Sequence, residues 1–293
     1  MKSSIIIFNP AARRASKKKV EEASSFLRGK GFDTDVVVTG QRGHAEHFAR
    51  EAAKKEPSLI IAAGGDGTIN EVINGIVWSG VPLSLLPFGT TNVLAKELGI
   101  PEDVSGAMEA ATTGRPRTVS LGRIEIMGPP SAGPRYFCLM AGIGFDGKTV
   151  YEVNMSVKRI SGAAAYLFSG MRNLITNSPD KIVLIVEGRE LSGYSAIIGK
   201  ASRYGGNFKV TPDADLREPS LYACIFKGRR RSDFLRYIFG VMTSRHLKYR
   251  DITYVKATDI DIRGAAHIQT DGDYLGVSPA RVSVAKDALK LVC

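Results

Sequence analysis

The stretch Leu59-Ile60-Ile61-Ala62-Ala63-Gly64-Gly65-Asp66-Gly67-Thr68-Ile69-Asn70-Glu71-Val72 decides the fold. It opens with a near-continuous apolar run, as in a strand that is buried on both faces of a sheet. Glycines and one aspartate follow, and a helix is predicted from Thr68 to Val77. Glycine lets the backbone approach a ligand closely, and a helix start offers free N–H groups to an anion. The stretch therefore predicts a strand–loop–helix unit that holds phosphate.

Asp66 is the acidic residue of this loop. Like charges keep it from touching phosphate directly, so we expect it to hold a magnesium ion or its waters beside the phosphates. The alternative is a tight turn in which Asp66 only caps the helix. The loop is not a Walker A sequence, because no Gly-Lys-Ser/Thr follows, and it is not the six-residue dinucleotide fingerprint.

A second polar turn follows the next strand of the chain, Leu83–Leu86. Pro87-Phe88-Gly89-Thr90-Thr91-Asn92 leads into a predicted helix at Asn92–Leu98, so short hydroxyl and amide groups again stand at a helix start. In a parallel sheet the two loops would end on the same edge, where such sheets bind ligands. Two phosphate-type turns on one edge predict a nucleotide site.

Two domains are expected from a chain of 293 residues. Strands and helices alternate through the first part, which favours an α/β layer with a mainly parallel sheet. After Gly114-Arg115-Pro116 short strand candidates dominate, and only Lys158–Leu174 and Ser232–Thr243 are predicted as helices. We expect residues 1–120 with 287–293 to form an α/β nucleotide-binding domain, and residues 121–286 to form a β-rich sandwich.

Composition limits the surroundings and partners of the chain. The net charge of +11 favours acidic partners, which include nucleic acid, anionic lipid and nucleotide phosphate. Cys138, Cys224 and Cys293 have wide spacing without a motif, so they predict free thiols in a reducing compartment. The apolar runs are shorter than a membrane helix or a signal-peptide core. We therefore expect a soluble cytoplasmic protein that touches membranes peripherally.

The combined motifs resemble the diacylglycerol kinase catalytic domain family, which includes bacterial lipid kinases and sphingosine and ceramide kinases. The resemblance begins at Asn9-Pro10, is strongest at Gly64–Gly75 and Pro87–Asn92, and extends through most of the chain. Further matching segments, in the order of the family, are Gly142–Asp146, Lys158 with Ala165-Tyr166, Tyr204–Gly206 with Pro212, and Asp271–Asp273.

The resemblance implies an α/β domain like that of NAD kinases and phosphofructokinases, together with a β-sandwich, ATP, Mg2+ and a lipid alcohol as acceptor in phospholipid metabolism. Asp271 matches the general base of the family, and we expect it to face the glycine loop across an interdomain cleft. The alternative is that Asp271-Gly272 is a hairpin turn, which this dipeptide favours. The predicted nucleotide-binding residues are Asn9, Thr39, Gly64, Gly65, Asp66, Gly67, Thr68, Glu71, Gly89, Thr90, Thr91 and Asn92.

The chain departs from the family pattern at several positions. Many bacterial relatives carry an aspartate where Val93 and Ser120 stand, and a glutamate where Asp273 stands. The element that is linked to a structural magnesium in some of them reads Glu218-Pro219-Ser220-Leu221 here. Asp215 and Glu218 are then its predicted metal ligands, in addition to Asp66 at the phosphates.

A basic amphipathic segment predicts the membrane contact. Lys227, Arg229, Arg230 and Arg231 precede a helix with Phe234, Leu235, Tyr237, Ile238, Val241 and Met242. Such a helix can lie on an anionic membrane, and the alternative is a helix packed on the sandwich with a solvated cationic face. Nucleic acid is not expected as a partner, because zinc spacing, an RNP motif and a helix-turn-helix pattern are missing.

The leading hypothesis is an ATP- and magnesium-dependent lipid kinase with a diacylglycerol-type acceptor. NAD kinase is one alternative, because it also uses Gly-Gly-Asp-Gly-Thr, although the elements at Gly89–Asn92 and Asp271–Asp273 argue against it. A catalytically weak lipid or nucleotide-binding regulator is the other, and Val93 and Ser120 favour it. The sequence leaves open which lipid is the acceptor and whether the chain forms a homodimer.

Overall fold

The computed structural model describes residues 2–128, 133–145, 147–148, 151 and 180–293. The chain forms two compact units. The first comprises Met1–Ser120 and Lys286–Cys293, and the second comprises Leu121–Ala285, so Lys286 lies in the first unit and not in the second as expected. The predicted helix Lys158–Leu174 and Asp146 lie outside the described residues.

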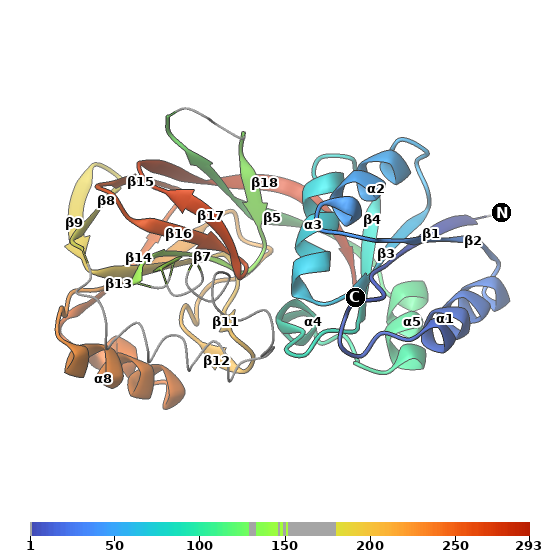
Figure 1. Cartoon of the computed structure of the whole chain (residues 1–293), viewed down its shortest axis with the longest axis horizontal. Coiled ribbons are helices and arrows are strands. Elements are labelled where there is room, and N and C mark those ends of the chain that lie inside the picture. Colours follow the sequence, from blue (N-terminus) through green and yellow to red (C-terminus); the bar gives the residue numbers. More distant parts are fainter. Residues whose placement is uncertain (1, 129–132, 146, 149–150, 152–179) are drawn as a thin grey trace. The chain divides into compact units, whose positions relative to one another are not determined.

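The first unit is built on a parallel sheet, with strand order β2-β1-β3-β4-β18 (Figure 1). Its strands are β1 (Lys2–Phe8), β2 (Phe32–Val38), β3 (Leu59–Gly64), β4 (Pro82–Pro87) and the end of β18 (Ala280–Val292). Ile6, Ile7, Ile60 and Ile61 are fully buried, as expected for strands that are covered on both faces. The predicted α/β layer is therefore confirmed.

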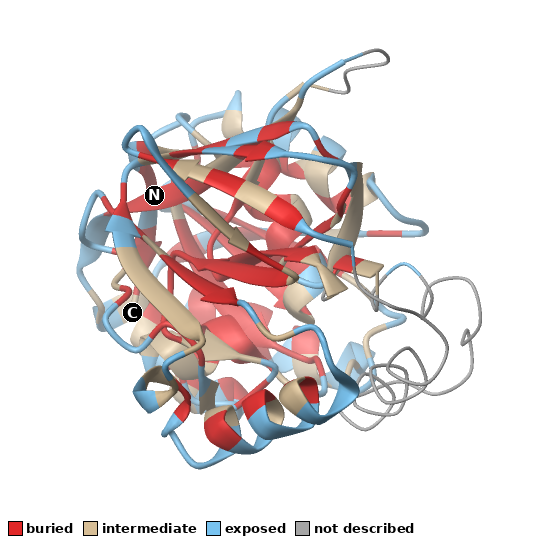
Figure 2. Cartoon of the chain, turned by 90° about the vertical axis from the view of Figure 1, so that its left-hand side faces the viewer, coloured by how far each residue is buried: buried red, intermediate tan, exposed pale blue. Residues whose placement is uncertain are grey.

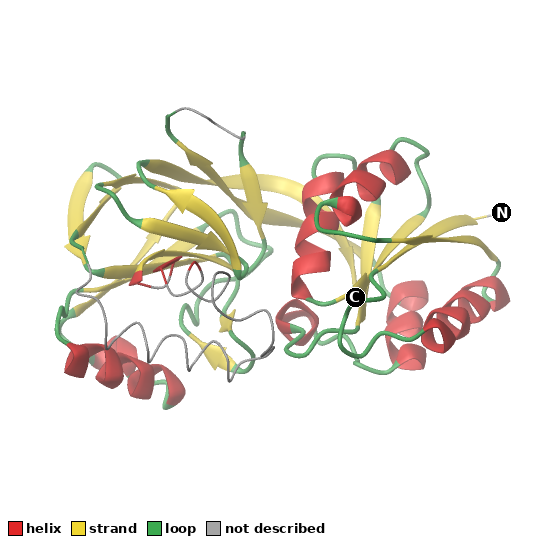
Figure 3. Ribbon diagram, viewed as in Figure 1, coloured by secondary structure: helices red, strands yellow, loops and turns green. Residues whose placement is uncertain are grey.

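Helices cover both faces of this sheet (Figure 3). On one face α1 (Lys17–Gly29) packs against α5 (Val104–Thr113), and on the other α2 (His44–Ala53) packs against α3 (Asp66–Ile76). The short helix α4 (Val93–Leu98) follows the second polar turn. Side chains cap α1 and α5, where Ser16 and Asp103 accept hydrogen bonds from Lys19 N–H and Gly106 N–H.

The second unit is β-rich, as predicted. One antiparallel sheet has the order β14-β13-β10-β7-β16-β17, and the strands β9, β8, β15 and the beginning of β18 follow one another in a second. Their bounds are β7 (Met140–Gly144), β8 (Ile182–Val186), β9 (Arg189–Gly193), β10 (Ser195–Gly199), β13 (Leu221–Phe226), β14 (Ile252–Ala257), β15 (Asp259–Arg263), β16 (His267–Thr270) and β17 (Asp273–Val277). The remaining strands are β5 (Pro116–Ile126), β6 (Arg135–Phe137), β11 (Arg203–Tyr204) and β12 (Phe208–Lys209).

Buried residues from both sheets form one core in the second unit (Figure 2). Ile143, Ile198 and Ile225 come from the first sheet, and Leu184 and Ile260 come from the second. The alternation of buried and less buried residues along β8 is typical of a strand that faces such a core on one side. The second unit is therefore a β-sandwich.

Helix α8 (Arg231–Met242) is the predicted basic helix and lies in the second unit. Its Tyr237 hydroxyl accepts a hydrogen bond from Gly228 N–H at 2.7 Å and donates one to the Asp251 carboxylate at 2.5 Å. Arg236 also pairs with Asp251. These contacts anchor one side of α8, whereas Leu235, Phe239 and Met242 on its other side are exposed.

Candidate nucleotide site and Asp271

The glycine loop lies where β3 passes into α3. Gly65 precedes the helix, and the first helical hydrogen bond runs from Ile69 N–H to Gly65 O at 3.0 Å. The N–H groups of Asp66, Gly67 and Thr68 therefore have no acceptor within the helix. The N-cap residue of this helix is Gly65, which has no side chain to cap it. Such a start is suited to bind an anionic group.

The glycines of this loop serve different purposes. A Cβ atom on Gly64 would lie 2.6 Å from Thr68 Cβ, and one on Gly65 would lie 3.2 Å from Gly89 Cα. These two glycines are needed for packing within the protein. A Cβ atom on Gly67 would meet no protein atom within 4 Å, so Gly67 faces open space.

The second polar turn packs directly on the glycine loop. Strands β3 and β4 are parallel neighbours, and Gly64 is paired with Pro87 in register. Phe88 N–H donates to Gly64 O at 2.8 Å, and the backbones at Gly65 and Gly89 are in close contact. The structure thus brings the two predicted loops together at the carboxyl edge of the sheet, as the parallel arrangement requires.

Asp66 connects the two loops. Its carboxylate accepts hydrogen bonds from the Thr91 hydroxyl at 3.0 Å and from Leu94 N–H at 3.3 Å. Burial raises the pKa of Asp66, and the hydrogen bonds from Leu94, Thr91 and Val93 oppose this shift only in part. Asp66 therefore binds the start of α4, a contact that the sequence did not predict.

The other predicted nucleotide-binding residues lie in different surroundings. Asn9 follows β1, and its amide donates to the Thr68 hydroxyl at 2.8 Å, so it joins the glycine loop. Glu71 instead accepts hydrogen bonds from Gly43 N–H and Ala45 N–H at 2.9 and 3.1 Å, and thereby caps α2. Thr39 is buried directly after β2. In the second turn, Thr90 is exposed, Thr91 is half-buried and Asn92 is fully buried.

Asp271 lies in the second unit, at the hairpin between β16 and β17. Asp271 and Gly272 have φ values of 48° and 89°, the left-handed pair of a tight Asp-Gly turn. The Asp271 carboxylate accepts hydrogen bonds from three successive N–H groups, those of Cys138, Leu139 and Met140, at 2.9, 3.0 and 2.9 Å. These donors fix the orientation of the Asp271 side chain. A hairpin turn by itself does not require such contacts.

Two residues at which the chain departs from the family pattern, Ser120 and Val93, have structural roles. The Ser120 hydroxyl accepts a hydrogen bond from Asp287 N–H at 3.2 Å, where β18 has a left-handed residue. Val93 is buried at the start of α4. Both residues therefore have roles in packing within the first unit.

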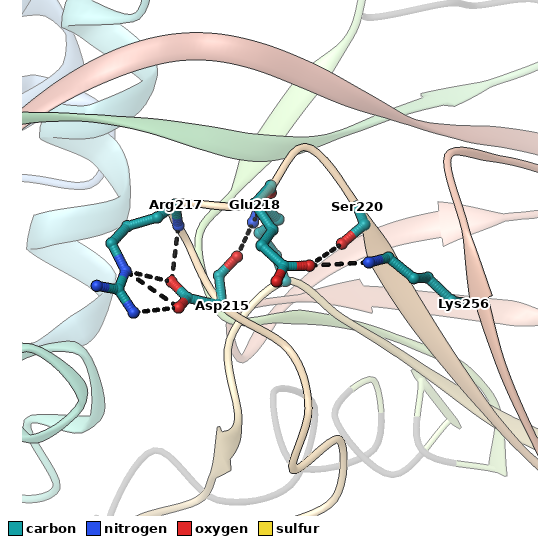
Figure 4. A network of polar contacts seen from close by, with 6 residues as sticks. Asp215, Arg217, Glu218, Ser220 and Lys256 are labelled. Atoms are coloured by element: carbon teal, nitrogen blue, oxygen red, sulfur yellow. Dashed lines mark hydrogen bonds and ion pairs between the residues drawn. The ribbon is translucent and has the colours of Figure 1, made fainter.

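Metal ligands do not converge among the residues that the structure describes: no three His, Cys, Asp or Glu side chains are grouped so as to hold an ion. The Asp215 carboxylate pairs with Arg217, and the Glu218 carboxylate pairs with Lys256 (Figure 4). These two side chains do not fit a shared magnesium site. Asp66 is different, because magnesium at a nucleotide needs only one or two carboxylates in addition to phosphate oxygens.

Comparison with known proteins agrees with this geometry. The model of the diacylglycerol kinase catalytic domain matches residues 3–124, and that of the YegS C-terminal NAD kinase beta sandwich-like domain matches residues 140–293. A diacylglycerol kinase of Bacillus subtilis (strain 168) is 32% identical over 287 residues, which cover 95% of this chain and 92% of the relative.

Solved structures show the same fold. The structure of a diacylglycerol kinase from Bacillus anthracis str. Sterne matches with a TM-score of 0.77 and 22% identity, over 99% of this chain and 96% of that one. Yeast NADH kinase complexed with NADH matches with a TM-score of 0.56 and 10% identity, over 100% of this chain and 83% of that one. With both units matched and a relative 32% identical over nearly its whole length, the chain belongs to the diacylglycerol kinase family of lipid kinases, which are phosphotransferases with an alcohol group as acceptor.

Proposed function

We propose that this chain transfers the γ-phosphate of magnesium-bound ATP to the hydroxyl group of a diacylglycerol-type lipid. The observation that carries the proposal is the joined pair of loops, Gly64–Thr68 and Gly89–Asn92, at the carboxyl edge of one parallel sheet. The names of the relatives support the choice of lipid.

The first unit binds the nucleotide. The N–H groups at the start of α3 point to phosphate oxygens, and the Thr90 hydroxyl on the exposed turn adds a further donor. Magnesium, when bound, neutralises charge on the phosphates. Asp66 would hold the magnesium ion. A carboxylate has about four acceptor positions, and Thr91, Leu94 and Val93 use three of them, so one is left for the ion.

In the second unit, Asp271 acts as the general base. The lipid hydroxyl oxygen attacks the γ-phosphorus, the bond from this phosphorus to the β-phosphate oxygen breaks, and ADP leaves. The proton of the hydroxyl passes to the Asp271 carboxylate. The N–H groups of Cys138, Leu139 and Met140 support this role because they hold the carboxylate in one orientation.

Helix α8 brings the enzyme to its lipid at an anionic membrane surface. Leu235, Phe239 and Met242 are 53%, 62% and 55% exposed, and their spacing places them on one side of the helix. Exposed basic residues flank this apolar stripe at Lys227, Arg229, Arg230, Arg245 and Arg250. Apolar side chains that enter the interface beneath a basic rim are typical of helices that lie on membranes. None of the helices in the described part of the chain has the length and apolar character needed to span a bilayer.

Transfer of radiolabelled phosphate from ATP tests the proposal. The acceptor panel consists of diacylglycerol, monoacylglycerol, phosphatidylglycerol, sphingosine, ceramide and NAD, with and without a chelator. We expect labelled phosphatidic acid, and its loss when magnesium is removed. Labelling of NAD alone would indicate an NAD kinase, and no labelled product would indicate a regulator that binds without catalysis.

A further inference from the structure

Lys200 is a fully buried lysine in the second unit. It directly follows β10, and its side chain has a relative exposure of 0%. Lysine is almost never buried without a partner, because its charge is costly to remove from water. The backbone around it is fixed, since Lys200 N–H and Ala201 N–H both donate to Leu139 O, at 2.8 and 3.1 Å.

The Lys200 ammonium is bound by the backbone of one turn. Its Nζ donates to the carbonyl oxygens of Asp215 and Glu218 at 2.5 and 2.9 Å. Each of these oxygens also accepts a backbone hydrogen bond, from Glu218 N–H at 3.2 Å and from Ser220 N–H at 2.9 Å respectively. A carbonyl oxygen has two lone pairs, so both carbonyls are saturated by the ammonium and the backbone.

The carboxylates of the same turn bind other cations (Figure 4). Arg217 Nε contacts both Asp215 oxygens at 3.0 Å, and Lys256 Nζ donates to Glu218 Oε2 at 2.9 Å. Lys200, Arg217 and Lys256 thus bring three positive charges to two carboxylates. A divalent cation at this turn would meet a positive surplus and carbonyl oxygens that are already used.

We infer that the Lys200 ammonium takes the place of a metal ion at the Asp215–Ser220 turn, so that the second unit holds this turn with its own cation and needs no divalent ion there. This inference concerns the structural metal of the second unit and is independent of the magnesium at the nucleotide. Because the Leu139 carbonyl binds the Lys200 backbone and the Leu139 N–H binds the Asp271 carboxylate, the turn is connected to the predicted base through one residue.

Thermal unfolding of the full chain tests the inference. The wild type is measured without nucleotide, after treatment with excess EDTA and after addition of Mg2+ or Ca2+. We expect the same melting temperature in all three conditions. The Asp66→Asn variant is measured in parallel, so that ion binding at the glycine loop is not mistaken for binding at the turn. A melting temperature that falls with EDTA and recovers with metal in Asp66→Asn would overturn the inference.

Lys200→Met provides the second measurement, with Lys256→Met as the matched control on the exposed side of the turn. Without the ammonium, the carbonyls of Asp215 and Glu218 each lose a buried hydrogen bond. We expect Lys200→Met to lower the melting temperature by several degrees and Lys256→Met to change it little. An unchanged melting temperature in Lys200→Met would contradict the inference. If this variant does not fold, the EDTA and metal series on Asp66→Asn remains decisive.

Discussion

The hydroxyl of Thr91 donates a hydrogen bond to the carboxylate of Asp66 at 3.0 Å, and this contact joins the two polar loops of the first unit. Asp66 was expected to act through a metal ion or to cap its own helix, but its observed partners are Thr91 and the start of α4. A structural role and a metal-binding role of Asp66 predict different affinities for ATP when Asp66 or Thr91 is replaced.

For Asp66→Asn we expect a larger loss of affinity for magnesium-bound ATP than for metal-free ATP, because the variant loses the charge that would attract the ion. Thr91→Val is the matched control, since it removes the hydrogen bond and leaves the carboxylate. Calorimetry with and without a chelator measures both variants. Equal losses in the two conditions for Asp66→Asn would mean that Asp66 only connects the loops.

For Gly67→Val we expect a folded protein whose dissociation constant for ATP rises by at least about tenfold, or roughly 1.4 kcal/mol. The Cβ atom of the new side chain meets no protein atom within 4 Å, and the side chain would occupy the space beside the free N–H groups of α3. Gly29→Val is the control, because its Cβ atom also meets no atom within 4 Å but lies in α1. Normal ATP binding by Gly67→Val would refute the assignment of the phosphate loop.

Asp271→Asn should lower turnover by a factor of ~10²–10⁴ and leave ATP affinity nearly unchanged, if general-base catalysis dominates. Asparagine retains the shape and one acceptor oxygen but cannot take the proton. The measurements are steady-state kinetics and nucleotide titration, with Asp259→Asn, which disrupts a surface ion pair with Arg281, as the control. If the Asp271→Asn variant remains active, Asp271 is a residue of the hairpin turn and not the general base.

Replacement of Arg229, Arg230 and Arg231 by Gln should weaken binding to anionic vesicles by a factor of about 100, because each basic side chain near such a surface contributes ~1 kcal/mol. High salt should have the same effect. Replacement of Lys30, Lys54 and Lys55 removes the same charge from the first unit and controls for net charge. Vesicle binding that is insensitive to salt, or absent from the wild type, would exclude this docking surface.

The stability of the second unit should fall in acid through Asp251. Burial favours a higher pKa for this carboxyl, but hydrogen bonds from Tyr237 and Arg236 outweigh it and leave the pKa below its ordinary value. The unfolded chain then binds the proton first, so the stabilisation is present above pH ~4 and is lost as the pH falls through the folded pKa. Asp251→Asn should cost about 1 kcal/mol near neutral pH, given the partial exposure of the pair. Denaturant unfolding at several pH values should show the difference from the wild type narrowing below pH ~4.

The sequence predicted those parts of the fold that carry a periodic apolar pattern. The strand Leu59–Gly64 and the helix α3 were found within one or two residues, because the apolar run and the glycines mark them clearly. Strand β7 was largely missed, although it lies within the core sheet, because its two glycines are unfavourable in the interior of a strand and fall in the segment Gly142–Asp146 that resembles the family. Helix α5 was missed as well, and the aspartate cap at Asp103 was the available signal.

The candidate site was predictable in its loops but not in its connections. Glycines and short polar residues at strand ends identify the loops, whereas the bond from Thr91 to Asp66 depends on how the two loops pack. Lys200 was missed because a lysine after a strand is normally solvated. The apolar run Ala196–Ile198 shortly before Lys200 was an indication in the sequence, and the structure shows that the whole strand Ser195–Gly199 is buried.

Strand β18 has a consequence for the order in which the protein can form during translation. Its last residues pair with β4, where Leu291 lies beside Leu83 and the Ser84 hydroxyl donates to Val292 O at 3.2 Å. When the first 120 residues leave the ribosome, β4 therefore has an open side with unpaired backbone groups. The whole second unit must be synthesised before this side is closed, so the parallel sheet of the first unit is completed only after the second unit has been made.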